Sequence, residues 1–242
     1  VNDAPTISGL LAGCSTPPTS QELASSCAGL TGASIPVTAI GLPSGPAAVS
    51  AAVLVPAAAV NSNVVTPATP AYCKVLGILA PLDPAAQRIN FQLNLPLNWN
   101  GKALQYGGGG LNGVLITGLA PLRDASPDDP LPLARGYATF GTDSGHQAAA
   151  FAPSEPGAFA LNDEMLENFA HASYKKVRDV AVEVMRQYYR GSPRQVYYFG
   201  GSEGGREGLA MAQRYPADYD GIASVVPVIN WTGLFHAFVR NQ

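Results

Sequence analysis

The stretch Gln195-Val-Tyr-Tyr-Phe-Gly-Gly-Ser-Glu-Gly-Gly-Arg206 decides the fold of this chain. It begins with β-forming residues, passes through Gly200-Gly-Ser-Glu-Gly204, and leads into the apolar spacing of an amphipathic helix. The middle segment matches the G-x-S-x-G nucleophile elbow in the strand, turn and helix context that this motif requires. The flanking glycines are needed because side chains there would collide with the neighbouring strand and helix. The pattern predicts that Ser202 is a nucleophile on a sharp turn.

A second glycine-rich segment, Gly107 to Gly113, follows an expected strand at residues 102–106. In α/β-hydrolases, one backbone N–H of such a loop and the N–H of the residue after the nucleophile bind the oxyanion. We therefore expect Gly109 and Glu203 to donate these two N–H groups. A phosphate-binding loop is disfavoured because no Gly-Lys-Ser/Thr sequence follows the glycines. A plain flexible turn remains the alternative interpretation.

The rest of the pattern indicates an α/β domain. A helix is expected over residues 168–189, where apolar residues recur at helical spacing. Strands alternating with helices favour a mostly parallel sheet, and the consecutive N-terminal strands favour an antiparallel edge. The expected strands span residues 40–55, 72–79, 89–95, 102–106, 136–141, 196–199 and 221–226.

None of the three histidines fits the position of a catalytic base. In an elbow hydrolase the chain order is serine, then acid, then histidine, but His146 and His171 precede Ser202. His236 follows the serine closely, within an apolar helix pattern. We expect structural roles for all three, and the alternative is a short variant in which His146 or His236 is the base. Asp143 and His146 lie in a turn-like segment and are candidates to fix a loop beside the site.

Composition restricts the function classes. The 242 residues are 47% hydrophobic and 13% charged, with a formal net charge of −3 and no basic stripe, which argues against a nucleic-acid partner. The apolar stretches are too short and too rich in proline to span a membrane. No His, Cys and Asp cluster has metal-ligand spacing. Low charge, many small polar residues and three early cysteines indicate a secreted or periplasmic protein with at most one internal disulfide.

Several segments together resemble the tannase/feruloyl esterase family, over roughly residues 25–242. The resemblance implies an α/β-hydrolase fold and a serine esterase that cleaves small esters of aromatic acids through an acyl-enzyme. The Ser202-Glu-Gly-Gly-Arg-Glu207 form is especially similar to the branch with a bacterial mono-hydroxyethyl terephthalate hydrolase. The matching segments are Cys27-Ala-Gly-Leu30, Ala71-Tyr-Cys73, Trp99-Asn-Gly101, Gly107 to Gly113, Thr142-Asp-Ser-Gly-His146, Phe169-Ala-His-Ala-Ser-Tyr174, Tyr198 to Arg206, Ala212 to Ile222, Val226-Pro227 and Asn230-Trp231.

The resemblance also implies a domain organisation. Residues 1–25 are expected to be an N-terminal extension, residues 26–228 the N-terminal part of the hydrolase domain, and residues 229–242 the start of a lid insertion. In the family the catalytic Asp and His follow the lid, which often carries a structural calcium. We therefore expect no cofactor or metal in this chain, and we expect the Asp and His to come from a remainder of the protein or from a second chain.

The cysteines follow the family pattern in one place and depart from it in another. The resemblance implies a Cys27–Cys73 disulfide that leaves Cys14 outside. The family usually places a cysteine directly before the nucleophile, bonded to one beside the catalytic His, whereas this chain has Gly201. The alternative to an esterase is a degenerate hydrolase fold that serves as a binding module, and the intact elbow argues against it.

Overall fold

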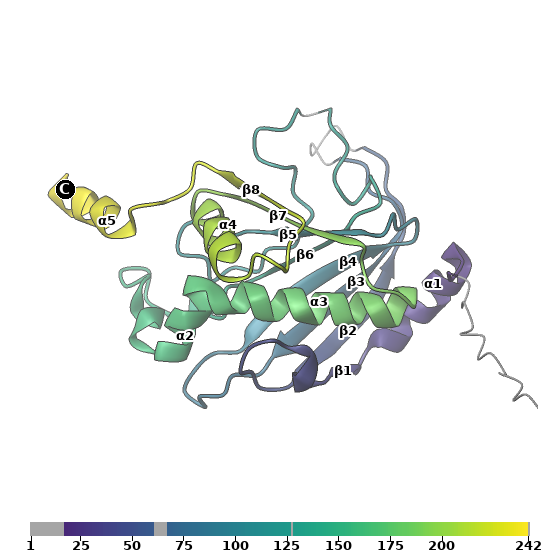
Figure 1. The fold of residues 1–242 in the computed structure, drawn as a ribbon, viewed down its shortest axis with the longest axis horizontal. Coiled ribbons are helices and arrows are strands. Elements are labelled where there is room, and N and C mark those ends of the chain that lie inside the picture. Colours follow the sequence, from purple (N-terminus) through teal and green to yellow (C-terminus); the bar gives the residue numbers. More distant parts are fainter. Residues whose placement is uncertain (1–16, 61–66, 127, 242) are drawn as a thin grey trace, which may run out of the picture.

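The computed structural model describes residues 17–60, 67–126 and 128–241, which form one eight-stranded sheet covered by helices (Figure 1). The strand order across the sheet is β1-β2-β3-β4-β6-β5-β7-β8. The strands are β1 (Ser34–Ile35), β2 (Ala47–Val55), β3 (Tyr72–Leu79), β4 (Ile89–Pro96), β5 (Lys102–Tyr106), β6 (Ala138–Thr142), β7 (Gln195–Gly201) and β8 (Gly221–Val225).

The sheet has an antiparallel half and a parallel half. Each of β1 to β4 pairs antiparallel with its sequence neighbour, and β4 also pairs antiparallel with β6. β5 pairs parallel with both β6 and β7, and β7 pairs parallel with β8. The carboxyl ends of β5 to β8 therefore meet at one edge of the sheet. This arrangement confirms the predicted α/β class and its antiparallel N-terminal edge. The expectation of a mostly parallel sheet is wrong, because the antiparallel edge extends as far as the β4–β6 pair and four of the seven strand pairings are antiparallel.

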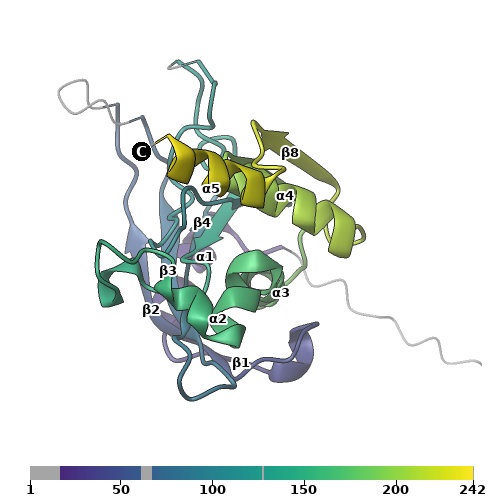
Figure 2. The same ribbon diagram turned by 90° about the vertical axis from the view of Figure 1, so that its left-hand side faces the viewer.

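The helices lie mainly on one face of the sheet. The two views show α3 (Ser173–Tyr189) and α4 (Glu203–Arg214) beside each other on that face (Figures 1 and 2). α2 (Asp163–Glu167) leads into α3 through a π-helical turn, Asn168–Ala172. α1 (Ser20–Ser26) packs near the end of α3, where Tyr188 Oη donates to Leu23 O at 2.8 Å. α5 (Trp231–Arg240) projects from the body at the C-terminal end (Figure 1).

The expected strand at residues 40–55 is shorter in the structure. β2 begins at Ala47 because two prolines and two glycines interrupt residues 41–46. The strand β1 was not predicted, because two residues are too few to show alternation of apolar and polar side chains. The helix expected over residues 168–189 is confirmed, although its first turn is π-helical rather than α-helical. The other expected strands are found within a few residues of their predicted ends.

Buried apolar side chains join the helix layer to the sheet. Val177, Val180 and Val184 of α3 are buried against strand residues of the same core cluster. Cys27 and Cys73 form a disulfide, the pair that the resemblance implies, and it ties the segment after α1 to β3. Cys14 lies outside the described residues.

Candidate active site

The loops that follow the parallel strands converge at the carboxyl edge of the sheet. The glycine-rich loop, residues 107–113, follows β5, and the loop of residues 143–146 follows β6. Gly113 N donates to Asp143 O at 3.2 Å, which joins these two loops. Ser202 N donates to Val225 O at 2.9 Å, which joins the turn after β7 to the end of β8. The edge therefore gathers all the segments in which sequence analysis placed site residues.

Ser202 occupies a strained turn between β7 and α4. Its φ of 60° and ψ of −118° lie outside the regions favoured by residues with a Cβ. The turn is held because the Ser202 carbonyl oxygen accepts from Gly205 N at 3.0 Å and Arg206 N at 3.2 Å, in the first turn of α4. This geometry is that of the nucleophile elbow, with the serine as the residue that caps the helix.

The glycines around Ser202 allow unusually close backbone contacts. A Cβ at Gly200 would lie 2.2 Å from Gly204 O, and a Cβ at Gly204 would lie 2.6 Å from Gly108 O. Real Cβ atoms do not approach backbone atoms this closely, so larger residues would move α4 away from β7 and from the glycine-rich loop. Local sequence thus sets the distance between the serine turn and that loop.

The two expected oxyanion donors have different surroundings. Glu203 is the first residue of α4, and no acceptor among the described residues is bonded to its N–H, which lies at the positive end of the helix dipole. Gly109 N instead donates to Asn112 Oδ1 at 2.5 Å. An oxyanion would therefore have to share or displace that bond, and the assignment of Gly109 stays a prediction.

The Glu203 side chain points into the protein and pairs with Arg206. It is only 1% exposed, and Oε1 accepts from Arg206 Nε at 2.6 Å, while Oε2 is buried and has no hydrogen-bond partner among the described residues. Burial raises the pKa of Glu203 to about 7, against the opposing effect of Arg206. Arg206 also donates to the carbonyl oxygens of Phe169 and Ala170, so it joins α4 to the π-helical turn.

None of the three histidines is hydrogen-bonded to Ser202 Oγ. His146 is buried, its Nε2 lies 3.0 Å from Leu111 O, and its ring stacks on Phe159 at 3.8 Å. Burial lowers the pKa of His146 to about 4, so it is neutral near pH 7. His171 Nδ1 lies 2.8 Å from Tyr215 Oη, and His236 lies on the exposed side of α5.

Asp143 fixes the loop after β6. Its carboxylate accepts four hydrogen bonds, two from Asn90 and one each from Gly145 N and Gln147 Nε2. The turn that follows this loop contacts the end of the glycine-rich loop, because Ala148 N donates to Gly113 O at 2.9 Å. Asp143 and His146 thus lie behind the loop that sequence analysis placed at the site, and their supporting role stays a prediction.

Glu207 was not among the predicted site residues, and it is fully buried beneath the glycine-rich loop. Its carboxylate accepts from Gly108 N, Asn112 Nδ2, Tyr174 Oη and Tyr198 Oη. Its spacing in the sequence could have indicated that it is buried. Glu207 lies three residues after Gly204 and four before Met211, on the face of α4 that packs against the sheet. A charged residue on that face requires partners for its charge.

Comparison with known proteins identifies the family. Residues 73–242 match the family described as "Tannase and feruloyl esterase". The chain belongs to this family. It is 42% identical, over 88% of its length, to an uncharacterised esterase of Agrobacterium fabrum, and 33% identical, over 66% of its length, to mono(2-hydroxyethyl) terephthalate hydrolase of Piscinibacter sakaiensis. The matches cover 37% and 27% of those two relatives, respectively.

Solved structures of the family have the same fold. Feruloyl esterase B of Aspergillus oryzae aligns with 85% of this chain and 37% of its own, with a TM-score of 0.60 and 26% identity. Tannin acyl hydrolase of Aspergillus niger aligns with 90% of this chain and 39% of its own, with a TM-score of 0.63 and 24% identity. Together with the sheet order and the elbow, these alignments confirm the predicted α/β-hydrolase fold.

In this tannase-family chain, Gly201 directly precedes Ser202. A Cβ at Gly201 would lie 2.8 Å from Cδ of Arg123, whose side chain is about half exposed. The space beside the serine turn that a larger residue would occupy is therefore taken by an arginine from the loop between β5 and β6.

No group of His, Cys, Asp and Glu that could hold a metal ion occurs among the described residues. No helix in the described part of the chain is long and apolar enough to cross a membrane.

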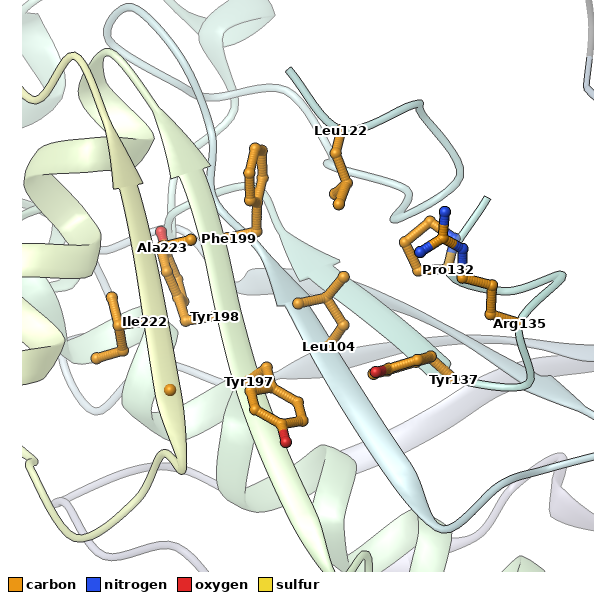
Figure 3. Close-up of a pocket in the computed structure, with 11 residues that line it drawn as sticks. Leu104, Leu122, Pro132, Arg135, Tyr137, Tyr197, Tyr198, Phe199, Ile222 and Ala223 are labelled. Atoms are coloured by element: carbon orange, nitrogen blue, oxygen red, sulfur yellow. The ribbon is translucent and has the colours of Figure 1, made fainter. Parts of the chain in front are cut away.

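A cavity of about 370 Å³ lies on the sheet face opposite α4 (Figure 3). Side chains alternate along β7, so the hydroxyl of Tyr198 reaches Glu207 of α4, while Tyr197 and Phe199 lie on the other face of the strand. Ser202 and Glu203 do not line the cavity. The lining comes from Leu104, Leu122, Pro132, Arg135, Tyr137, Tyr197, Tyr198, Phe199, Gly221, Ile222 and Ala223.

Proposed function

We propose that this chain carries the nucleophile and the oxyanion donors of a serine carboxylic-ester hydrolase. The observation that supports this most strongly is the strained backbone of Ser202 directly before α4, beside the N–H of Glu203, which has no acceptor in the described part of the chain. Strain at a single polar residue persists where the surroundings hold it, and such positions concentrate at functional sites. The family membership supports the same reaction class.

In the proposed reaction, Ser202 Oγ attacks the carbonyl carbon of an ester and loses its proton to a general base. The negative charge that develops on the carbonyl oxygen is stabilised by the N–H of Glu203 and by the glycine-rich loop, for which we keep Gly109 as the expected donor. The C–O bond to the alcohol then breaks, and the alcohol leaves with the proton from the base. Water, activated by the same base, hydrolyses the acyl-enzyme and releases the acid.

The base and its carboxylate partner are proposed to come from protein outside these residues, on a remainder of the chain or on a second chain. His146 and His171 have buried or partly buried partners within the fold, and His236 projects away on α5. A lid with a structural calcium, implied by the family resemblance, would likewise lie outside the described residues. The chain spans 37% of the length of its Agrobacterium relative.

We propose small esters of aromatic acids as the substrates. The support is that relatives carry the names mono(2-hydroxyethyl) terephthalate hydrolase and feruloyl esterase, which describe esters of that class. We also propose that the protein is secreted or periplasmic, because the Cys27–Cys73 disulfide requires an oxidising environment.

The test is covalent labelling of the full-length protein with an aryl fluorophosphonate, followed by peptide mapping. We expect the label on Ser202 and slow or no turnover of 4-nitrophenyl esters after labelling, with no label on the Ser202→Ala variant. A folded protein that binds aromatic esters without labelling or turnover would instead support the binding-module alternative.

A further inference from the structure

We propose that Glu207 is a positioning residue, which holds the glycine-rich loop (residues 107–113) at the distance from Ser202 that oxyanion binding requires. This inference rests on the proposed esterase function and adds a residue that acts through its neighbours rather than on the substrate. It concerns a charged side chain in the interior of the fold whose partners come from both the loop and the sheet.

The first observation is that Glu207 is surrounded by donors. Oε2 accepts from Gly108 N at 2.9 Å and from Tyr198 Oη at 2.7 Å. Oε1 accepts from Tyr174 Oη and Asn112 Nδ2, both at 2.5 Å. Both carboxylate oxygens are thus fully used, and two of the four donors belong to the glycine-rich loop.

Asn112 extends the contact to the residue expected to bind the oxyanion. Its Nδ2 donates to Glu207, and its Oδ1 accepts from Gly109 N at 2.5 Å. The side-chain amide therefore transmits the position of the carboxylate to the backbone of Gly109. Asn112 has a positive φ of 48°, a conformation that asparagine tolerates better than most residues, and this suits its position between Glu207 and Gly109.

The loop and α4 are in direct backbone contact around this carboxylate. Gly204 N donates to Gly108 O at 3.2 Å, and a Cβ at Gly107 would lie 2.9 Å from both Glu207 Oε2 and Gly204 Cα. Since Gly204 is only two residues from Ser202, a displacement of the loop alters its distance from the nucleophile. Glu207 therefore controls a distance on which catalysis depends steeply.

A carboxylate is required because an amide cannot accept at both ends. With glutamine at position 207, an NH₂ group in place of Oε2 would face Gly108 N–H. In the opposite orientation, the NH₂ group would replace Oε1 and would face Asn112 Nδ2. A flip of the Asn112 amide could relieve that contact, but it would remove the oxygen that accepts from Gly109 N. The two tyrosine hydroxyls could turn to accept, and Tyr174 Oη already accepts from Asn112 Nδ2 at 2.6 Å, but in either orientation one of the two loop donors loses its acceptor at position 207.

The two tyrosines hold the carboxylate from the opposite side. Burial, together with the nearby Glu207 charge, raises the pKa of both Tyr174 and Tyr198 well above the ordinary value, so both hydroxyls keep their protons. They come from α3 and β7, two elements that are fixed in the core. The carboxylate is thus anchored to the rigid body on one side and to the loop on the other.

The experiment compares Glu207→Gln with Asp179→Asn in the full-length protein. Asp179 is a suitable control because it is also a buried carboxylate on a helix and accepts from Gly41 N and from Lys175 and Arg178, none of which belongs to the elbow or to the glycine-rich loop. For each variant, kcat and KM for a 4-nitrophenyl aryl ester, the Ki of an aryl boronic acid and the Tm are measured. The boronic acid forms a tetrahedral adduct whose oxygen occupies the oxyanion position.

For Glu207→Gln we expect kcat to fall about 10²-fold and the Ki of the boronic acid to rise by a similar factor, because loss of one oxyanion donor typically lowers kcat by about that factor. KM should stay within about threefold of the wild-type value. Asp179→Asn should lower Tm without changing kcat or Ki. Unchanged kcat and Ki for Glu207→Gln would overturn the inference. If Glu207→Gln does not fold, Asn112→Gly, which fits the local backbone, should show the same pattern in smaller size, and unchanged kcat and Ki there would overturn it too.

The two proposals fail in different ways. If wild-type Ser202 takes no fluorophosphonate label, the esterase proposal itself is wrong. If Ser202 is labelled normally and Glu207→Gln behaves like Asp179→Asn, only the positioning role is wrong.

Discussion

The antiparallel and parallel halves of the sheet are built in different ways. β2, β3 and β4 pair with their sequence neighbours, and the Cys27–Cys73 disulfide lies in that half. β5 pairs in parallel with both β6 and β7, and β7 pairs in parallel with β8, and strained backbone gathers beyond the carboxyl ends of these strands. The non-glycine residues with positive φ there are Asn112, Ser144, Ser202 and Val226. One half thus holds the fold together through local pairing, and the other holds costly conformations where the chemistry is expected.

The largest expected effect is at Ser202 in the parallel half. Ser202→Ala should lower kcat by about 10⁶-fold, the loss typical of a missing nucleophile in a catalytic triad. The Tm should change little, because the Ser202 side chain makes no hydrogen bond within the described residues. Steady-state kinetics and thermal unfolding of the same preparation measure both. Activity within tenfold of wild type would show that the nucleophile lies elsewhere.

The corresponding change in the antiparallel half should affect stability alone. Replacing Cys27 and Cys73 together by alanine removes a cross-link between positions 46 residues apart, which is expected to cost about 4 kcal/mol in the free energy of unfolding. Urea unfolding measures this loss. At a temperature where the variant stays folded, kcat should equal that of wild type, and a large drop in kcat would mean that the two halves are coupled more tightly than their geometry indicates.

Glu203 should make stability depend on pH from within the parallel half. Its pKa is raised from an ordinary 4.5 to about 7, so the folded state favours the protonated acid. That contribution is complete below pH 4.5 and is lost as the pH rises through about 7, a change of the order of 3 kcal/mol. Glu203→Gln should flatten this part of the profile, measured by urea unfolding between pH 4.5 and 8. An equally steep profile in the variant would assign the dependence to another group.

A matched pair of glycines gives the finest comparison. A Cβ at Gly204 would lie 2.6 Å from Gly108 O, and a Cβ at Gly77 would lie 2.6 Å from Ala48 O and also 2.1 Å from the Phe91 ring. Each alanine variant should cost about 1–3 kcal/mol of stability through overpacking. Only Gly204→Ala should also lower kcat, by about 10²-fold, because it moves the glycine-rich loop relative to Ser202. Equal kcat values for the two variants would contradict this division.

Much of the fold followed from local sequence. β3 and β5 have the predicted ends because prolines, glycines and turn residues bound them clearly. β1 was missed because two residues carry no period, and the π-helical turn at Asn168–Ala172 was missed because one wide turn hardly disturbs the apolar spacing of a long helix.

The site was predictable where one segment specifies it and not where distant segments meet. The elbow is encoded within a few residues, so the turn at Ser202 and the helix start at Glu203 were predictable from sequence, while their catalytic roles stay a prediction. Three of the four donors to Glu207 lie 33 to 99 residues away in the sequence, and the fourth, Tyr198, lies 9 residues away. No local pattern shows that these residues converge. The bond between Gly109 N and Asn112 Oδ1 is likewise visible only in three dimensions.

The alternation of side chains along β7 has a consequence for how this strand can vary over evolution. Tyr198 contacts α4 on one face, while Tyr197 and Phe199 line the cavity on the other. Inserting or deleting a single residue within β7 would exchange the two faces and turn the serine away from the carboxyl edge. Changes of residue type at the cavity-facing positions leave that direction intact. We therefore expect related sequences to vary in the identity of these residues while keeping the length of β7 constant up to the serine.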